Sequence, residues 1–446
     1  MQNKILPEEQ KGCRRNTKGC KDQLLTNKMI IEKAKMKKKD LSIAWIDYKK
    51  AYDSIPHSWI KRCLQIYKLS PIIREFIEST MNNWKTEMQL FYNNGSIKTR
   101  KIIIKRGIFQ GDSLSPLLFC LGLTPLSKML NREKIGYAVE SNKKINHLLY
   151  MDDVKVFAKN DLQLGQIINI IKEFSDDIHM QFGLDKCAKI TIKKGKYIAG
   201  ENIILNEQEQ IQNLEQGEMY KYLGVHENTE IQQHKMKMNI KKEYFRRSRL
   251  VLKTELNLKN KIKALNSLAI PVVQYSFGVI DWKMQEIKSM DRKTRKILTM
   301  HGLHHPKADV ERLYIQRREG GRGLIELEAA YKTAIIGLCD YIKFANDRYI
   351  EMVKLHENTK PKYSIIKIGE KIANHYNCNK IDERKIFFIK QAIAQEKEEL
   401  LNMKPLHGQF QRELKKTYVD HKLTNGWLKS AGLKGETESL IIAAQD

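Results

Sequence analysis

The sequence predicts an α+β fold for the first half of the chain and a helical fold for the second half. Up to about residue 225, short apolar runs bounded by turn residues, which are typical of strands, alternate with amphipathic helical segments. Beyond that point the apolar spacing is mainly helical. With 446 residues, 41% of them hydrophobic, the chain can bury a sizeable core and form two or three domains.

The first predicted elements are a helix and a buried strand. Apolar residues recur at helical spacing from Leu24 to Met36, and the apolar run from Leu41 to Ile46 predicts a strand that ends at Asp47. Two amphipathic helices are predicted next, from Trp59 to Leu69 and from Ile72 to Trp84.

A hairpin and a further helix follow. The predicted strands Thr86 to Tyr92 and Ile97 to Ile104 flank the loop Asn93-Asn94-Gly95-Ser96, whose composition favours positive backbone φ angles and chain reversal. Ser115 and Pro116 are predicted as the N-cap and the first residue of the helix, which is expected to be buried.

A pair of aspartates joins the last two predicted core strands. The runs Ile145 to Met151 and Val154 to Ala158 are apolar, and Asp152-Asp153 lie between them. An isolated pair of this kind is usually structural, because aspartate caps its own backbone in turns. Here another strand also ends in a carboxylate, at Asp47. We therefore expect two central strands of an antiparallel sheet to bring three carboxylates together, where they could bind Mg²⁺ through oxygen ligands.

The charge of the chain predicts a polyanionic partner. Lysine and arginine number 80 against 52 acidic residues, which gives a formal charge of +28. Cations that face phosphates bind nucleic acid by releasing counterions, without reading base sequence. No membrane association is expected, because no stretch reaches the roughly 18 uninterrupted apolar residues of a spanning helix.

Cysteine usage and the N-terminal sequence predict an intracellular protein, nuclear or cytoplasmic. The seven cysteines include no CxxC pair and no histidine at zinc-ligand spacing, so they resemble reduced thiols. The sequence from Met1 has no apolar signal-peptide core. The basic run Lys35 to Lys39 is interpreted either as an import signal or as a solvated helix end.

Five segments, in this order, resemble the motifs of non-LTR (LINE-type) retrotransposon reverse transcriptases. A single tetrapeptide such as Tyr-Met-Asp-Asp occurs by chance, but five matches in order are specific. The segments are Ala44 to Ser54 for motif A, Arg106 to Pro116 for motif B, Tyr150 to Asp153 for motif C, Phe182 to Lys186 for motif D, and Tyr220 to Gly224 for the primer grip.

The resemblance assigns expected roles to individual residues. Asp53 falls at a position that the family does not use for metal, so a structural role is expected for it. Tyr52 would be the aromatic gate that excludes a 2′-hydroxyl. The expected site residues are Asp47, Asp152 and Asp153 as catalytic ligands of two Mg²⁺ ions, with Mn²⁺ as an alternative, Lys186 as proton donor, Tyr52, Gln110 and Gly111 in the nucleotide pocket, and Tyr222, Leu223 and Gly224 as primer grip.

A basic helix is expected to bind nucleic acid. Between Ile231 and Met300 there are 17 lysines and arginines against 5 acidic residues. The cations expected to face the duplex are Lys241, Lys242, Arg246, Arg247 and Arg249, and the apolar residues expected to face the core are Tyr244, Phe245, Leu250 and Val251.

The resemblance implies a right-hand polymerase, with an antiparallel-sheet palm, a helical thumb and a helical C-terminal region. The expected segments are residual fingers at 1–40, a palm with motifs A to E at 41–225, a basic helical thumb at 226–300, and a helical post-thumb linker region at 301–446. The implied function is RNA-directed DNA polymerisation with an RNA template, a DNA primer and deoxynucleoside triphosphates, by two-metal nucleotidyl transfer to the primer 3′-hydroxyl.

Some features of the pattern are absent, and alternatives stay open. The fingertip segment of the family would lie upstream of Met1, and no endonuclease or zinc-finger pattern is present, so the chain is expected to be incomplete at both ends. The tail from Leu406 resembles the stretch before the zinc knuckle of the branch with a restriction-like endonuclease. The alternatives are a truncated, inactive remnant that binds nucleic acid, a group II intron maturase-like enzyme and, further off, a viral RNA-dependent RNA polymerase. The oligomeric state is open.

Overall fold

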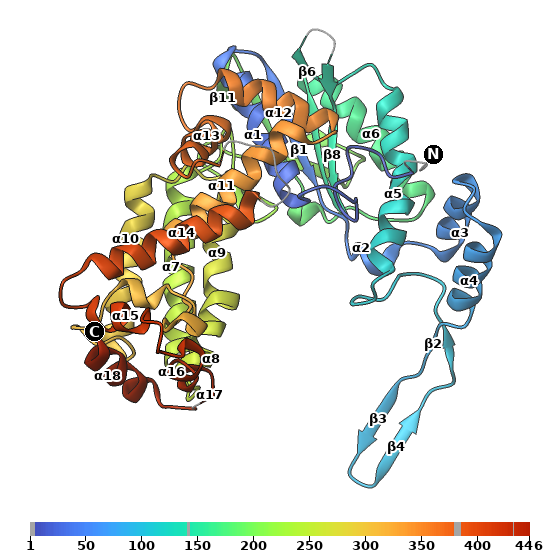
Figure 1. Ribbon diagram of the computed structural model, residues 1–446. Coiled ribbons are helices and arrows are strands. Elements are labelled where there is room, and N and C mark those ends of the chain that lie inside the picture. The colour runs from blue at the N-terminus through green and yellow to red at the C-terminus, as the bar shows by residue number, and fades with distance from the viewer. Residues whose placement is uncertain (1–4, 141–142, 379–384, 431) are drawn as a thin grey trace. The chain divides into compact units, whose positions relative to one another are not determined.

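The computed structural model describes residues 5–140, 143–378, 385–430 and 432–446 (Figure 1). By its contacts the chain divides into two compact units. Unit 1 contains Met1–Gln232 and Asp347–Ile350, and unit 2 contains Gln233–Asn346 and Glu351–Asp446. Unit 1 mixes strands and helices and unit 2 is helical, which confirms the predicted fold class. The finer segment names of fingers, palm, thumb and linker stay predictions.

Unit 1 is built around a seven-stranded sheet. Its central strand is β1 (Leu41–Ile46), which pairs antiparallel with β9 (Asp153–Ala158) on one side and β10 (Ala188–Lys193) on the other. All six residues of β1 are buried, which explains why its sequence is an apolar run rather than an alternating pattern. The outer strands are β8 (His147–Tyr150), β11 (Lys196–Ile198), β12 (Ile203–Ile204) and β13 (Gln210–Asn213).

Helices cover both faces of this sheet (Figure 1). The face that carries Ile46 packs in one core with α5 (Ser115–Arg132) and α6 (Asp161–Asp177). The opposite face carries Trp45 and is covered by α1 (Cys20–Met36) together with a small hairpin. That hairpin is formed by β14 (Tyr220–Tyr222) and β15 (Val225–Glu227).

The remaining elements of unit 1 are short. Between β1 and α5, three helices lead into two small strand pairs. The bounds are α2 (Ala51–Ser54), α3 (His57–Ile66), α4 (Pro71–Asn82), β2 (Lys85–Thr86), β3 (Gln89–Tyr92), β4 (Gly95–Lys98), β5 (Ile102–Ile103), β6 (Tyr137–Glu140), β7 (Lys143–Ile145) and a 3-10 turn at Leu184–Lys186.

Two local predictions in this unit are wrong. The hairpin β3–β4 forms, but its loop residues Asn93 and Asn94 have negative φ angles, and so does Gly95. Ser115 is the first helical residue of α5 and not its N-cap. The Asp112 carboxylate accepts hydrogen bonds from the Ser115 backbone nitrogen at 3.1 Å and from Ser115 Oγ at 3.0 Å, so the capping oxygen comes from three residues upstream.

Unit 2 consists of helices. Pro271 lies in the first turn of α9, directly after a π-helical turn at Leu265–Ala269, where its missing N–H is tolerated. Within the described ranges, no helix is both long and apolar enough to cross a membrane. The helices are α7 (Gln233–Leu252), α8 (Leu258–Ala264), α9 (Ile270–Ser276), α10 (Met284–Met300), α11 (Leu327–Phe344), α12 (Arg348–Thr359), whose first turn belongs to unit 1, α13 (Ile365–His375), α14 (Lys385–Met403), α15 (Gln409–Leu414), α16 (His421–Thr424), α17 (Trp427–Ser430) and α18 (Gly435–Gln445).

Candidate active site

The pairing of β1 with β9 brings the predicted carboxylates to one end of the sheet. Ile46 pairs with Val154, so Asp47, the next residue, lies beside Asp153 at the start of β9. Asp152 occupies the turn of the β8–β9 hairpin, one residue before Asp153. The three carboxylates therefore lie at the ends of two central strands, as the apolar runs predicted.

These carboxylates repel one another electrostatically. Burial, followed by the charges of Asp152 and Asp47, raises the pKa of Asp153 to about 6. Burial and the charge of Asp47 also raise the pKa of Asp152, while Lys186 opposes that shift. In the described part of the chain, the one cation within 4 Å of the three is Lys186, whose Nζ lies 3.5 Å from Asp47 Oδ2. The site is thus deficient in positive charge.

The chemistry of this donor set fits a hard divalent cation. Carboxylate oxygens are the ligands that Mg²⁺ takes in proteins, usually one or two together with substrate phosphates. No group of three or more acidic, histidine or cysteine side chains in the described ranges is gathered tightly enough to hold a metal by itself.

Tyr52 lies between the carboxylates and α5. Its ring stacks on Phe119 with centroids 5.0 Å apart and planes at 5°, and its hydroxyl donates to Met151 Sδ at 3.4 Å. Burial raises the pKa of the Tyr52 phenol to about 12, so it stays neutral. These contacts hold the ring near Asp152, and Tyr52 as a whole is half-buried.

The loop that precedes α5 carries the other predicted pocket residues, and its Ile108 nitrogen donates to the Tyr52 carbonyl at 2.8 Å. Gln110 and Gly111 are exposed, and Gly111 has a φ of 93°, which favours glycine. No protein atom lies within 4 Å of the place where a Gly111 Cβ would be, so the positive φ and not a tight neighbour explains the glycine here. A Cβ on Gly107 would lie 3.0 Å from the backbone of Asp53, so the glycine allows this loop to pass close to α2. The structural role expected for the Asp53 side chain stays a prediction.

The predicted primer-grip residues form the turn of the β14–β15 hairpin. Tyr222 is 2% exposed and points into the core, whereas Leu223 and Gly224 make the turn itself, with φ angles of 44° and 78°. Of these three residues, Leu223 and Gly224 are accessible to a ligand, whereas Tyr222 is not.

Sequence reasoning missed a buried ion pair that fastens this hairpin to the sheet. Lys155 of β9 and Glu227 of β15 form an ion pair, and both side chains are fully buried. Glu227 also accepts hydrogen bonds from Trp45 Nε1 at 2.7 Å and from Asn27 Nδ2 at 2.5 Å. Lys155 lies over the Tyr222 ring, 4.6 Å from its centroid. A lysine inside the apolar run of β9 was the available signal.

The predicted basic residues lie on α7 of unit 2, and several are already paired. Arg246 and Arg247 each lie 2.7 Å from the Glu243 carboxylate, and they lower the pKa of Glu243 to about 2. Lys241 lies 3.6 Å from Glu286. Tyr244, Phe245 and Val251 are buried as predicted, but Leu250 is 53% exposed, because it lies about 120° around the helix from Tyr244 and outside the buried face.

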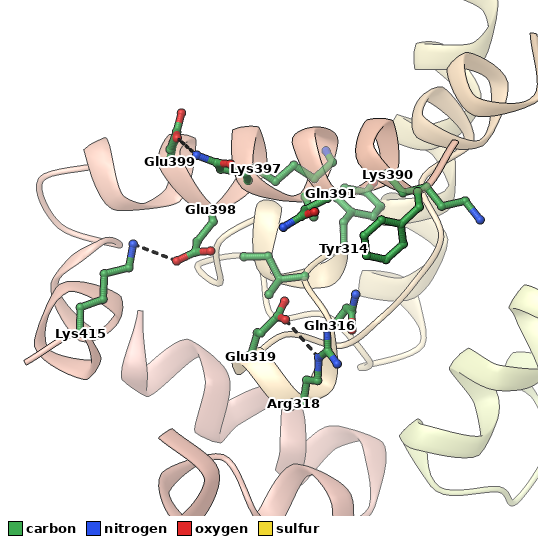
Figure 2. A pocket seen from close by; sticks show the side chains of 14 residues that line it. Tyr314, Gln316, Arg318, Glu319, Lys390, Gln391, Lys397, Glu398, Glu399 and Lys415 are labelled. Carbon is green, nitrogen blue, oxygen red and sulfur yellow. Dashed lines mark hydrogen bonds and ion pairs between the residues drawn. The ribbon is translucent and has the colours of Figure 1, made fainter. Parts of the chain in front are cut away.

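A polar pocket of about 580 Å³ in unit 2 is a weaker candidate (Figure 2). Most of its charged side chains already form ion pairs. Lys415 lies 2.8 Å from Glu398, Arg318 lies 3.1 Å from Glu319, and Lys397 lies 2.8 Å from Glu326. The pocket therefore offers a ligand little uncompensated charge.

A largely antiparallel sheet, with two helices on one face and three carboxylates at the end of its central strands, is the arrangement that the resemblance predicted for a polymerase palm. The model of the family described as reverse transcriptase (RNA-dependent DNA polymerase) matches residues 1–227, about half of the chain. The chain belongs to the reverse transcriptase family. Reverse transcriptases generally use divalent metal ions.

The chain is also similar to curated Pol polyproteins of R2 retrotransposable elements. It is 24% identical over 323 residues to one from Popillia japonica, covering 71% of this chain and 52% of the relative. It is 22% identical over 287 residues to one from Drosophila melanogaster, covering 63% of this chain and 26% of the relative. A third, from Nasonia vitripennis, is 31% identical over 202 residues, covering 44% and 19%. The chain thus spans about half or less of these relatives.

The relatives confirm the expected resemblance to non-LTR retrotransposon reverse transcriptases. The branch with a restriction-like endonuclease stays a prediction. Among solved structures, apo telomerase from Candida tropicalis aligns with a TM-score of 0.35 and 14% identity, over 75% of this chain and 56% of that chain. A superposition this loose carries no weight beside the family match.

Proposed function

We propose that the chain is an RNA-directed DNA polymerase of a non-LTR retrotransposon, acting inside the cell on an RNA template, a DNA primer and deoxynucleoside triphosphates. The observation that supports it most is the placement of Asp47 beside Asp153, with Asp152 in the adjoining turn. These three residues lie within the part of the chain that matches the reverse transcriptase family.

In this proposal each residue of the site has a distinct task. Asp47, Asp152 and Asp153 would hold two Mg²⁺ ions, which, when bound, supply charge to activate the primer 3′-hydroxyl and to stabilise the leaving pyrophosphate. Lys186, 65% exposed and next to Asp47, would give a proton to the pyrophosphate. Tyr52, Gln110 and Gly111 would surround the nucleotide, and the turn at Leu223 would hold the primer end.

The direct test is primer extension by the purified chain. A DNA primer annealed to an RNA template should be extended in the presence of Mg²⁺ or Mn²⁺, and it should not be extended in the presence of a chelator. The alternative of an inactive remnant predicts binding of the same primer–template without extension under either ion. A maturase-like enzyme would extend primers too, but would prefer structured intron RNA over an unrelated template of equal length.

Removing the Tyr52 ring should relax sugar discrimination. In Tyr52→Val, the space beside the incoming sugar is no longer filled, so ribonucleotide use relative to deoxynucleotide use should rise by about 10- to 100-fold, as expected when a packing interaction worth about 1–3 kcal/mol is removed. The measurement is the ratio of kcat/KM for the two nucleotides. Tyr52→Phe is the matched control: it keeps the ring that stacks on Phe119 and should keep the parent ratio. Equal ratios in all three proteins would remove Tyr52 from the nucleotide site.

Charge removal from α7 should weaken duplex binding in a salt-dependent way. Log affinity falls with log salt by about 0.9 per phosphate neutralised on B-form DNA. Replacing Arg246, Arg247 and Arg249 by glutamine should make this slope less steep. The change should be smaller than that for three phosphates, because Arg246 and Arg247 are already paired with Glu243. The product made in one binding event should become shorter, whereas the rate of single-nucleotide addition on a saturating template should stay unchanged.

Glu243→Gln is the opposite control for this helix. It frees both arginines from their carboxylate, so binding at low salt should tighten and the slope should steepen. If the triple variant and Glu243→Gln both keep the parent's slope and product length, α7 does not contact the duplex.

A further inference from the structure

A ribbon of residues 85–106 projects from unit 1 with both of its faces uncovered (Figure 1). Every residue from 85 to 103 is exposed. Its outer part is the hairpin β3–β4, in which Leu90 pairs with Ile97 and Phe91 pairs with Ser96. An isolated two-stranded hairpin is at best marginally stable in water, so its exposed apolar surface indicates a partner.

The side chains of the ribbon combine rings with uncompensated positive charge. Phe91 is 78% exposed and Tyr92 is 58% exposed. The ribbon contains six lysines and arginines against one acid, Glu87. In the described part of the chain, one of these cations is paired with a carboxylate: Lys98, 3.3 Å from Glu87. The other cations of the ribbon are Lys85, Arg100, Lys101, Lys105 and Arg106.

The base of the ribbon is fixed at the proposed nucleotide pocket. Trp84, where the ribbon begins, packs on Phe109 at 4.6 Å and on His57 at 5.2 Å between ring centroids. The Ile104 nitrogen donates to the Trp84 carbonyl at 3.0 Å, which closes the base. Phe109 is followed directly by Gln110, a predicted residue of the nucleotide pocket. A single strand bound along the ribbon would therefore reach the pocket at the ribbon's base.

We propose that this ribbon binds the single-stranded RNA template ahead of the nucleotide pocket. The inference rests on the proposed polymerase function and adds a surface to it. Aromatic rings that stack on successive bases, with cations along the backbone, are how proteins hold single strands without reading sequence. The net positive charge favours a nucleic acid over a protein partner as the occupant.

The test compares primer–templates that differ in the unpaired RNA beyond the primer end. Full-length protein should bind a template with an overhang of about 12 nucleotides more tightly than one with a single-nucleotide overhang. In Phe91→Ala/Tyr92→Ala this preference should fall at least about fivefold, the lower range for losing one stacked base. Each single variant then assigns the face that the strand follows. Extension by one nucleotide on the short overhang should match the parent.

Charge removal gives an independent readout. Arg100→Gln/Lys101→Gln should reduce the salt slope for the long overhang by about 0.7 for each phosphate that is no longer neutralised, the value for single strands. The matched control is Lys194→Gln/Lys196→Gln, which removes two exposed lysines from the β10–β11 hairpin of the same unit and should leave the slope unchanged.

The outcomes distinguish a failure of the ribbon inference from a failure of the proposed polymerase function. A parent that extends primers but shows no overhang preference, or ribbon variants that keep the parent's preference, would overturn the ribbon inference and leave the polymerase intact. A parent that binds the RNA overhang through the ribbon but extends nothing would overturn the polymerase proposal alone. Equal affinity for a DNA overhang would overturn the assignment to RNA, and ring variants that lose self-association rather than RNA binding would assign the ribbon to a second copy of this chain.

Discussion

Replacing Asp152 by asparagine should abolish primer extension and, without divalent metal, should make unit 1 more stable. Loss of a ligand charge removes several kcal/mol of transition-state stabilisation, which lowers the rate by about 10³-fold or more. The stability change has the opposite sign because the Asp152 carboxylate is partly buried beside Asp47 and Asp153, and its pKa is raised.

The sign of the stability effect follows from proton linkage. The pKa of Asp153 is about 6 in the folded chain against an ordinary value of 3.8, so the folded state binds more protons between those values. Stability without metal should therefore fall as the pH rises from about 4 through 6. Asp152→Asn removes one source of that shift and should flatten this fall.

The measurements are primer extension, equilibrium binding and thermal unfolding in a chelator and in Mg²⁺. Primer–template affinity should stay within about twofold of the parent, since the cations of unit 2 are untouched. Mg²⁺ should stabilise the parent by mass action and the variant less. Asp177→Asn, at the exposed end of α6, is the matched loss of one carboxylate and should behave as the parent. An Asp152→Asn variant that extends primers normally would exclude Asp152 as a ligand.

The sequence predicted the parts of this site that depend on backbone pattern. An apolar run that ends in an acid predicted β1 and Asp47, and two apolar runs around Asp152 predicted the β8–β9 hairpin. Because strand ends meet in a sheet, the convergence of the carboxylates followed from these three runs. The family resemblance then gave the roles that spacing could not.

What the sequence left open depends on contacts between distant residues. Nothing near Lys155 in the sequence names Glu227 as its partner, since the two lie 72 residues apart. Likewise Ser115 satisfies the composition rule for an N-cap, but it is the first helical residue, and the Asp112 carboxylate accepts from the Ser115 backbone nitrogen. The pairing of Arg246 and Arg247 with Glu243 was visible as helical spacing, although a charge count alone treats both arginines as available for phosphate.

Breaking the buried pair between Lys155 and Glu227 should destabilise unit 1 more than any surface change. Lys155→Met leaves Glu227 fully buried as an uncompensated carboxylate, which costs about 3–5 kcal/mol. Trp45 Nε1 and Asn27 Nδ2 still donate hydrogen bonds to Glu227, so its carboxylate keeps part of its stabilisation. Trp45 lies two residues before Asp47, and Lys155 lies two residues after Asp153. Both β1 and β9 should therefore become less stable when the ion pair is broken.

Replacing both partners should recover most of this loss. In Lys155→Met/Glu227→Gln no charge is buried, and the new amide can accept from Trp45 Nε1. Asn27 Oδ1, which has no hydrogen-bond partner among the described residues, gains a donor when Asn27 turns its amide over. The pair's coupling energy then follows from a double-mutant cycle.

Native-state hydrogen exchange at β1 and β9 measures the change in stability of unit 1 in these variants. It reports the opening free energy of those two strands and not that of unit 2. Lys159→Met, an exposed lysine just beyond β9, is the control and should stay within about 0.5 kcal/mol of the parent. If Lys155→Met leaves the exchange of β1 and β9 unchanged, the ion pair does not hold the β14–β15 hairpin to the sheet. If the double variant is as unstable as Lys155→Met, the cost comes from poorer packing over Trp45 and Tyr222 rather than from the unpaired charge.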